Sequence, residues 1–352
     1  MKGRLIAVER LGEGAVAAAL LVDGRLEDLL IDPPEADPLP RPEALHWARV
    51  ERLVAVAGAA FARLGDGTTG WLRAPQARPG DMLCVQVARW PDPGKAPPLN
   101  ERPVWKGRYA LLTPGAPGAN VARGIRGHAE RARLQALADA GLAGAPDDLG
   151  LVIRTAAANA DDAAIEGEIA ELRAMFDADR AAMTGTAPKL LRPAPDAAAR
   201  ALRDWADPEP DAVEEGEDAF ERLGVWDAIA DLRRARVDLP GGGWMSVEAT
   251  AAMIAVDVNT GEDFSKGAAQ RVNLAACAEL PRQLRLRGLG GVALIDFAPL
   301  PKGARQGVEN ALKRAFAEDP VDTTLAGWTP LGNFELTRKR ERRPLREALR
   351  DG

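Results

Sequence analysis

The stretch that decides the fold is AAMIAVDVNTG, Ala251–Gly261, together with GVALIDFAPL, Gly291–Leu300. Each segment carries an apolar run typical of a buried strand, and the runs end at Asp257 and Asp296. The residues between them, roughly Ala268–Arg287, have helical periodicity and stop at a glycine. A strand, a helix and a strand in this order predict a βαβ unit with two parallel strands.

The two aspartates would lie at neighbouring strand ends, where open α/β sheets bind their ligands. Asn259 follows Asp257 by two positions, so its amide points to the same side of the strand. Two carboxylates with no histidine or thiol close in sequence form a hard oxygen site that suits Mg²⁺ or Mn²⁺. The alternative is that Asp257 and Asp296 are solvent-facing residues that only cap strand ends.

Composition excludes several classes of protein. The 352 residues are 46% hydrophobic and 28% charged, enough for a sizeable core in roughly two to three domains. No apolar run reaches the ~18 residues of a membrane span, and the acidic N-terminal region is unlike a secretory signal. Two distant cysteines, Cys84 and Cys277, and two histidines argue against a disulfide scaffold, a His/Cys zinc site and a histidine-based triad. We therefore expect a cytoplasmic protein without a membrane segment.

Charge is unevenly distributed along the chain. The net charge is −6, but Gln270–Gly352 alone carries 15 basic and 10 acidic residues. A basic end on an acidic chain predicts a surface that meets a polyanion, and the alternative is a solvated C-terminal helix.

The remaining segments predict several smaller units. Leu5–Ile31 alternates in short runs around Asp23-Gly24, which predicts two or three antiparallel strands. Trp47–Leu99 contains short strand-like runs and Gly/Asp turns, which predict a small barrel such as an OB-fold. His128–Leu142 and Asp161–Arg180 have helical periodicity.

Three longer segments resemble a known family. They are VDLPGGGWMSVEATAAMIAVDVNTG (237–261), NLAACAELPRQLRLRGLGGVALIDF (273–297) and VENALKRAFAEDP (308–320). In content, order and spacing they closely resemble the catalytic region of the RNase E/RNase G family of bacterial endoribonucleases, and the rest of the chain resembles it more weakly. Pro281, inside the predicted helix, has no explanation in the sequence.

The resemblance implies an α/β fold of several subdomains. An RNase H-like part would be discontinuous, with an inserted OB-fold, a 5′-sensor subdomain and a DNase I-like catalytic subdomain. In this chain the implied ranges are 1–36 and 196–236 for the RNase H-like part, 40–102 for the OB-fold, 103–195 for the sensor and 237–352 for the catalytic subdomain.

The resemblance also implies an activity. Asp257 and Asp296 would hold a catalytic Mg²⁺, with Mn²⁺ as a substitute, and Asn259 would lie beside the scissile phosphate. The expected reaction is hydrolysis of single-stranded RNA to 5′-phosphate and 3′-hydroxyl ends, in RNA processing or decay. The alternative is a non-catalytic RNA-binding protein that retains the fold.

In the implied OB-fold, Phe61 and Trp71 match positions of family aromatics that would stack on unpaired bases. Lys95 matches a basic position that can meet a phosphate. The alternative for Phe61 and Trp71 is a place in the barrel core.

In the implied sensor, Arg154 and Thr155 would bind a 5′-monophosphate, and Gly107 and Leu111 would supply a close backbone wall. The alternative is a solvated arginine and a strand-end threonine. Asp322 falls where the family has a second arginine, so we expect a weak or absent preference for 5′-monophosphorylated RNA.

The family's CPxCxG zinc-link and the small domain after it have no counterpart before Gly352. We therefore expect no structural zinc, no zinc-linked tetramer, and a monomer or weak dimer. RNA binding would then depend on the basic stretch Arg338–Arg350. Cys277 is expected in a helix–sheet core.

Overall fold

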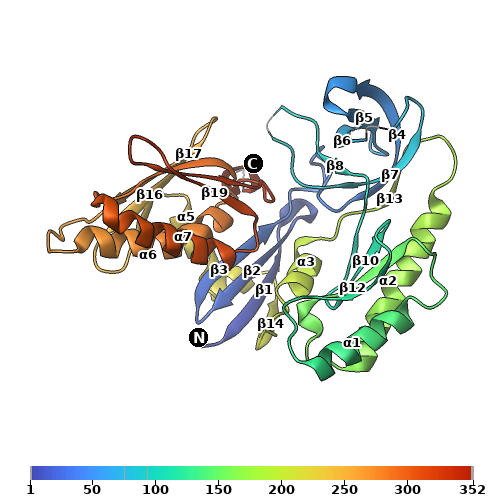
Figure 1. The fold of residues 1–352 in the computed structure, drawn as a ribbon, viewed down its shortest axis with the longest axis horizontal. Helices are drawn as coiled ribbons and strands as arrows, with labels where there is room; N and C mark the ends of the chain where they lie inside the picture. Colours follow the sequence, from blue (N-terminus) through green and yellow to red (C-terminus); the bar gives the residue numbers. More distant parts are fainter. Residues whose placement is uncertain (1, 75, 93, 350–352) are drawn as a thin grey trace.

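The computed structural model describes residues 2–74, 76–92 and 94–349. Within these residues the strands form four sheets, and helices cover three of them (Figure 1). The architecture is mixed α/β, as the sequence predicts, and the subdomain ranges and names implied by the resemblance stay predictions.

The first sheet has the strand order β14-β1-β2-β3 and joins two distant parts of the chain. β14 pairs in parallel with β1, so residues after position 196 complete the sheet that the N-terminus begins. Asp23 and Gly24 both have positive φ in the turn between β2 and β3, the backbone form that a tight hairpin requires. Apolar residues of α3 pack on one face and those of α4 and α5 on the other. The bounds are β1 Arg4–Arg10, β2 Val16–Val22, β3 Arg25–Ile31, β14 Ala212–Glu215, α3 Ala197–Asp204, α4 Ala219–Arg222 and α5 Val225–Leu232.

The second sheet is a nearly closed barrel with the strand order β6-β5-β4-β7-β8. A bridge between Trp71 and Pro98 brings the two edges together around a core of small and branched apolar side chains. β13 also pairs with β4, although the resemblance implies that its residues belong to the sensor range 103–195. The bounds are β4 Leu45–Val54, β5 Ala59–Arg63, β6 Thr69–Arg73, β7 Met82–Val87, β8 Leu99–Asn100 and β13 Lys189–Arg192.

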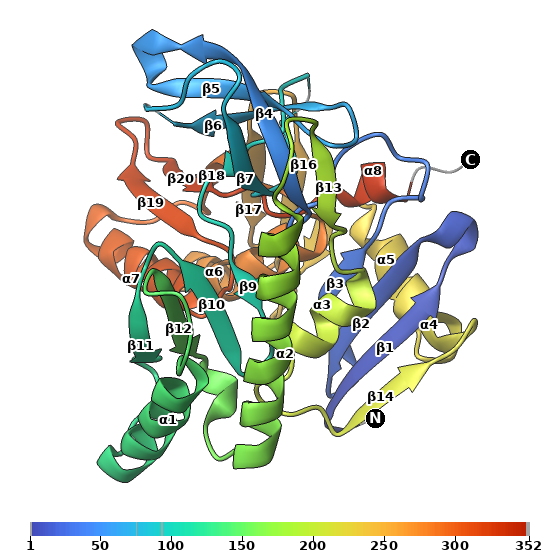
Figure 2. The same ribbon diagram turned by 90° about the vertical axis from the view of Figure 1, so that its right-hand side faces the viewer.

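The third sheet has the order β11-β12-β10-β9 and packs against α1 and α2. Figure 2 shows the long helix α2 extending from this sheet toward β13. Both helices fall where the periodicity predicts them. The bounds are β9 Trp105–Lys106, β10 Ala110–Pro114, β11 Gly118–Val121, β12 Leu149–Ile153, α1 His128–Gly141 and α2 Asp162–Ala182.

The fourth sheet has the order β15-β16-β17-β18-β20-β19, and it contains the predicted βαβ unit. β17 and β18 are parallel and α6 joins them. One face of the sheet packs on α6 and α7 through the largest apolar cluster of the chain, and the opposite face is open (Figure 1). The bounds are β15 Arg236–Asp238, β16 Trp244–Ala249, β17 Ile254–Asn259, β18 Gly291–Asp296, β19 Thr323–Trp328, β20 Phe334–Arg338, α6 Ala268–Leu286 and α7 Arg305–Ala317.

Pro281 is buried inside α6, which continues past it to Leu286. Cys277, on the same helix, is 1% exposed in the core of the fourth sheet, as expected. None of the helices in the described ranges is long and apolar enough to cross a membrane.

The solvated C-terminal helix considered for the basic end is wrong. After β20 the residues described up to position 349 form one short helix of four residues, α8, Leu345–Ala348. Leu345 packs into the apolar cluster beneath the first sheet, so this segment is docked on the protein.

Candidate functional site

The aspartates at the ends of β17 and β18 are direct neighbours in the fourth sheet. Asp257 lies opposite Asp296 in the parallel register, and hydrogen-bonded strands run about 4.8 Å apart. Both residues are exposed, whereas Val256, Val258 and Ile295 point into the helix-covered core. Strand alternation therefore places the two carboxylates side by side on the open face.

Asn259 orients one of the two carboxylates. Its Nδ2 donates to Oδ2 of Asp257 at 2.6 Å, which leaves Oδ1 without a bond in the described part of the chain. Neither Asp257 nor Asp296 forms an ion pair within that part. Two adjacent carboxylates without a cation repel each other, so this arrangement calls for an external positive charge.

The donor set fits a hard divalent cation with few protein ligands. The described residues contain no group of three or more His, Cys, Asp or Glu side chains that could hold a metal ion. Mg²⁺ does not need such a group, because it keeps several waters and commonly binds one or two carboxylates. Asp257 and Asp296 would be the protein ligands, and the open sheet face leaves room for water and substrate.

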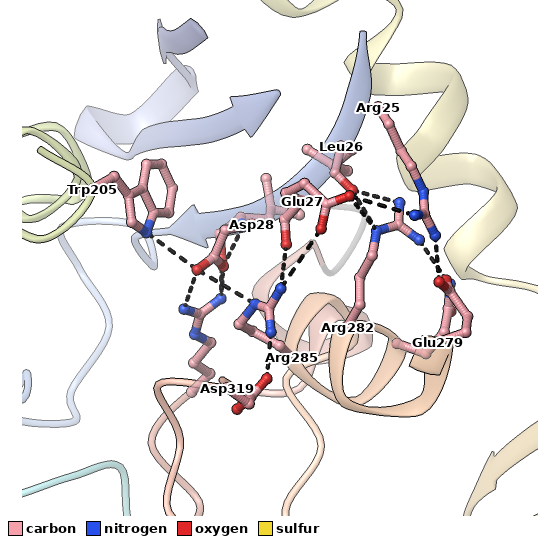
Figure 3. Close-up of polar contacts among 12 residues, drawn as sticks. Arg25, Leu26, Glu27, Asp28, Trp205, Glu279, Arg282, Arg285 and Asp319 are labelled. Carbon is pink, nitrogen blue, oxygen red and sulfur yellow. Dashed lines mark hydrogen bonds and ion pairs between the residues drawn. The ribbon is translucent and has the colours of Figure 1, made fainter. Parts of the chain in front are cut away.

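The helix behind this site is anchored to the first sheet by arginines (Figure 3). Arg282 Nε donates to the carbonyl oxygen of Leu26 at 2.8 Å, and Arg285 Nη2 donates to that of Glu27 at 2.8 Å. At the end of β3 Arg25 forms an ion pair with Glu279. Because α6 connects β17 to β18, these bonds fix the sheet that carries the carboxylates against β3.

A second pair of aspartates lies buried behind α6. Asp28 accepts from the Trp205 indole at 3.1 Å and pairs with Arg342, and Asp319 pairs with Arg285 and with Arg338 at 2.8 Å. Burial alone would raise the pKa of Asp28, but Arg342 and the other bonds to its carboxylate lower it below the usual value.

The basic stretch Arg338–Arg350 is not the free polyanion-binding surface that the sequence suggests. Arg338 is 2% exposed, Arg340 pairs with Asp92 at 3.1 Å, and the side chain of Arg343 pairs with Asp37 at 2.6 Å. These arginines neutralise carboxylates from distant parts of the chain. Arg350 lies outside the described residues.

The barrel carries an aromatic patch on its outer surface. Phe61 lies directly opposite Trp71 in the β5–β6 ladder, and both are partly exposed while Ala60, Ala62 and Leu72 fill the core. The core placement considered for Phe61 and Trp71 is therefore wrong.

An arginine extends this patch, and the loop that carries the predicted lysine runs beside β6. The Arg52 guanidinium lies over the Phe61 ring, 4.6 Å from its centroid. Lys95 lies in the loop before β8, where its side chain is 72% exposed and pairs with Asp92 at 3.1 Å. Two residues later the same loop meets β6, where the Trp71 N–H donates to the carbonyl oxygen of Pro97 at 2.8 Å.

Arg154 is held in place by neutral and acidic partners. It follows β12, and its guanidinium donates to the carbonyl oxygen of Gly107 at 2.5 Å and to Asp204 at 3.2 Å. Thr155 is exposed at the start of a short turn, and Leu111 is partly buried on the neighbouring β10. Arg154 and Gly107 thus lie together, as the resemblance implies.

Glu168 on α2 already occupies the backbone donors beside Gly107. Its carboxylate accepts from the N–H groups of Arg108, Tyr109 and Ala110 at 2.6 to 2.9 Å. A Cβ at Gly107 would collide with the Glu168 carboxylate, so a side chain here would displace that carboxylate from the three N–H groups.

Arg154 lines a cavity of about 790 Å³, whose walls also contain residues of the first sheet, α3 and the segment after α7. Its lining includes Lys106, Arg200, Pro320 and Val321. Asp322, the next residue, is not part of the lining. It is exposed and pairs with Lys339.

Acidic residues that the sequence does not predict surround Arg154. Glu43 binds Arg203 at 2.7 Å and Lys106 at 3.1 Å, and Arg203 also binds Asp204. These partners come from the barrel entrance, β9 and α3. Apart from the adjacent Arg203 and Asp204, these contacts join segments far apart in the chain, so no local pattern in the sequence marks them.

Comparison with known proteins identifies the family of this chain. The family model described as the Ribonuclease E/G family matches residues 105–214 and 207–341. The chain therefore belongs to the ribonuclease E/G family. The matched ranges include Arg154, Asp257 and Asp296.

Similar curated proteins carry ribonuclease names. Ribonuclease E of Synechocystis sp. (strain ATCC 27184 / PCC 6803 / Kazusa) is 32% identical over 80% of this chain and 47% of its own length. Ribonuclease E of Nostoc sp. (strain PCC 7120 / SAG 25.82 / UTEX 2576) is 31% identical over 78% and 45%. Ribonuclease G of Escherichia coli (strain K12) is 29% identical over 77% and 62%. The chain thus spans about half the length of the first two relatives and somewhat more of the third.

Proposed function

We propose that this chain is a metal-dependent endoribonuclease that hydrolyses single-stranded RNA to 5′-phosphate and 3′-hydroxyl ends, in RNA processing or decay. The observation that supports this most strongly is the register that sets Asp257 opposite Asp296 on an open sheet face. A pair of exposed carboxylates without a cation has no evident structural purpose, whereas Mg²⁺ or Mn²⁺ would neutralise it. The similarity to Ribonuclease E and Ribonuclease G supports RNA as the substrate.

Each residue of the proposed site has one defined role. Asp257 and Asp296 hold the cation, and Asn259 keeps the Asp257 carboxylate turned so that one oxygen remains available. When bound, Mg²⁺ supplies a Lewis acid for the phosphoryl oxygen and lowers the pKa of a bound water, so no histidine base is needed. Because this face of the sheet is open, an extended RNA strand can reach the two carboxylates without first displacing a covering segment.

RNA would be held at two further places. Phe61 and Trp71 offer ring faces to unpaired bases, and Arg52 adds a cation next to them. Arg154 and Thr155 would meet a 5′-phosphate, although Asp204 competes for the Arg154 guanidinium.

We further propose that the protein acts in the cytoplasm. Burial raises the pKa of both Cys84 and Cys277 to about 12, so both thiols stay protonated at neutral pH. Protonated thiols in two separate cores suit a reducing compartment and are poor ligands for a structural zinc.

A cleavage assay tests the proposal. With single-stranded A/U-rich RNA and Mg²⁺, we expect cutting that falls by roughly 10²–10³-fold in Asp257→Asn and in Asp296→Asn. RNA binding should be retained in both. Asp238→Asn, at an exposed aspartate of β15 in the same sheet, serves as the matched control.

The rival hypothesis, a non-catalytic RNA-binding protein, predicts binding without any cutting by the unmodified chain. Cleavage that persists in Asp257→Asn or Asp296→Asn would exclude these residues as the catalytic pair.

A further inference from the structure

A separate cavity of about 290 Å³ lies at the other end of the fourth sheet from the carboxylate pair. Residues at the end of α5, in the turn between β16 and β17, and around α8 form its walls. Leu232, Ile254 and Leu289 give it an apolar side, and Arg287 and Arg346 give it a cationic side. The lining includes Ile254, the first residue of β17, but neither Asp257 nor Asp296. The cavity and the candidate metal site therefore share no residues.

Arg287 is a buried cation without a carboxylate partner. It is 7% exposed, and its Nε and Nη1 donate to the side-chain oxygen of Gln283 at 3.0 Å and the carbonyl oxygen of Arg234 at 2.7 Å. Both acceptors are neutral, and within the described ranges Arg287 forms no ion pair. Its third nitrogen, Nη2, makes no bond there either.

The described residues around Arg287 do not supply a paired counter-charge for its guanidinium. Burial, and then the nearby Arg346, lower the pKa of Arg287 to about 10, and the charge of Glu279, which forms no ion pair with Arg287, offsets only part of this lowering. Arg346 is exposed and donates to the carbonyl oxygen of Arg233 at 3.4 Å, again a neutral acceptor. The acidic lining residue, Glu347, pairs with Arg343 at 3.8 Å.

We propose that this cavity binds a nucleotide, with its phosphate at Arg287 and Arg346 and its base against the apolar side. A guanidinium matches phosphate geometry with parallel donors, and a buried one gains most from such a partner. The apolar wall requires a ligand that is more than an inorganic ion, and the volume falls near the ~300 Å³ lower end of small-molecule sites. The nucleotide is either free in solution or part of an RNA chain. This site does not depend on the proposed cleavage activity.

Calorimetric titration tests the proposal with three probes: adenosine 5′-monophosphate, adenosine and inorganic phosphate. The full chain carrying Asp257→Asn is titrated without Mg²⁺, so that the candidate metal site takes no part. We expect the monophosphate to bind at least roughly tenfold more tightly than adenosine or phosphate, because each lacks one half of the recognition. Equal binding of adenosine, equal binding of phosphate, or no binding of the monophosphate would overturn the proposal.

Two variants locate the binding. Arg346→Ser removes an exposed cation and should weaken monophosphate binding roughly tenfold. Met253→Glu places a negative charge on another exposed lining residue and should weaken it as well. Arg314→Ser, at an exposed position of α7, is the control and should bind as the parent does. Unchanged binding in both lining variants would contradict the assignment.

A competition experiment separates the two sources of the nucleotide. A short single-stranded RNA that displaces the monophosphate, and does so less well in Arg346→Ser, supports a site for nucleotides of the RNA chain. Failure of the same RNA to displace the monophosphate supports a site for free nucleotides. Displacement that is equally strong in Arg346→Ser would contradict the cavity as the shared site.

Discussion

Two pairs of aspartates lie on either side of the same βαβ unit and have opposite surroundings. Asp257 and Asp296 are exposed on the open sheet face, and within the described residues no cation pairs with them. Asp28 and Asp319 are buried behind α6, where arginines surround them.

This contrast between the two pairs distinguishes charges that stabilise the fold from charges that serve the function. Each buried aspartate is neutralised by a guanidinium, so the second pair stabilises the packing of α6 on β3. The exposed pair repels itself and contributes nothing evident to the packing. Carboxylates kept adjacent at such a cost are typical of sites that bind a cation.

The largest effect that would test this comparison is on stability. Asp319 has a fully buried side chain, and Asp319→Ala leaves Arg285 and Arg338 without their shared partner. We expect the free energy of unfolding to fall by about 3–5 kcal/mol, measured by urea denaturation. Asp257→Ala, the matched exposed variant, should change it by less than about 0.5 kcal/mol. Similar losses of unfolding free energy in Asp319→Ala and Asp257→Ala would contradict the contrast between the buried and the exposed pair.

The pH dependence of stability sharpens the same contrast. Because the folded-state pKa of Asp28 is below its unfolded value of about 3.9, Asp28 stabilises the fold above that pH. This stabilisation is lost as the pH falls through the folded-state pKa. We expect the free energy of unfolding to decrease more steeply below about pH 4 in the unmodified chain than in Asp28→Asn. Parallel curves would show that the arginines do not lower the pKa of Asp28.

The aromatic patch of the barrel differs from both aspartate pairs, because its two rings are uncharged and partly exposed and the Arg52 guanidinium lies over one of them. Trp71→Ala and Phe61→Ala should each weaken binding of single-stranded RNA by about 1–3 kcal/mol, because each removes a stacking platform. Fluorescence anisotropy with the cleavage-deficient Asp257→Asn chain measures this without substrate loss. Val56→Ala, at an exposed apolar residue in the β4–β5 connection, is the control. Binding that changes no more in the aromatic variants than in this control would return Phe61 and Trp71 to a structural role.

The smallest effect is expected at Arg154. Its guanidinium is shared with Asp204, and Asp322 carries a negative charge near the same cavity. Cleavage of 5′-monophosphorylated RNA should therefore exceed that of triphosphorylated RNA by less than about tenfold. Asp204→Asn should increase the preference, because it releases one competitor for the guanidinium. A large preference that Asp322→Ala abolishes would contradict the repulsive role assigned to Asp322.

The sequence predicted the parts of this molecule that depend on neighbouring residues. The apolar runs before Asp257 and Asp296 gave both strands, and the Asp23-Gly24 dipeptide gave the hairpin turn. The family resemblance rested on the same segments, and the family model confirms it.

The contacts between distant segments could not be predicted from one sequence. Arg342 meets Asp28 across 314 positions, so no local pattern links them. The same limit explains why the C-terminal arginines suggested a free basic surface. A count of charges along the chain does not show which of them are neutralised by residues that fold against them.

The measurement that most directly tests the exposed pair as a cation site is a titration with Mn²⁺, followed by electron paramagnetic resonance. The unmodified chain and Asp238→Asn should each bind about one Mn²⁺ at this site, which Mg²⁺ displaces. Asp257→Asn and Asp296→Asn should each weaken this binding roughly tenfold or more. Equal Mn²⁺ binding in all four proteins would contradict the assignment of Asp257 and Asp296 as the metal ligands.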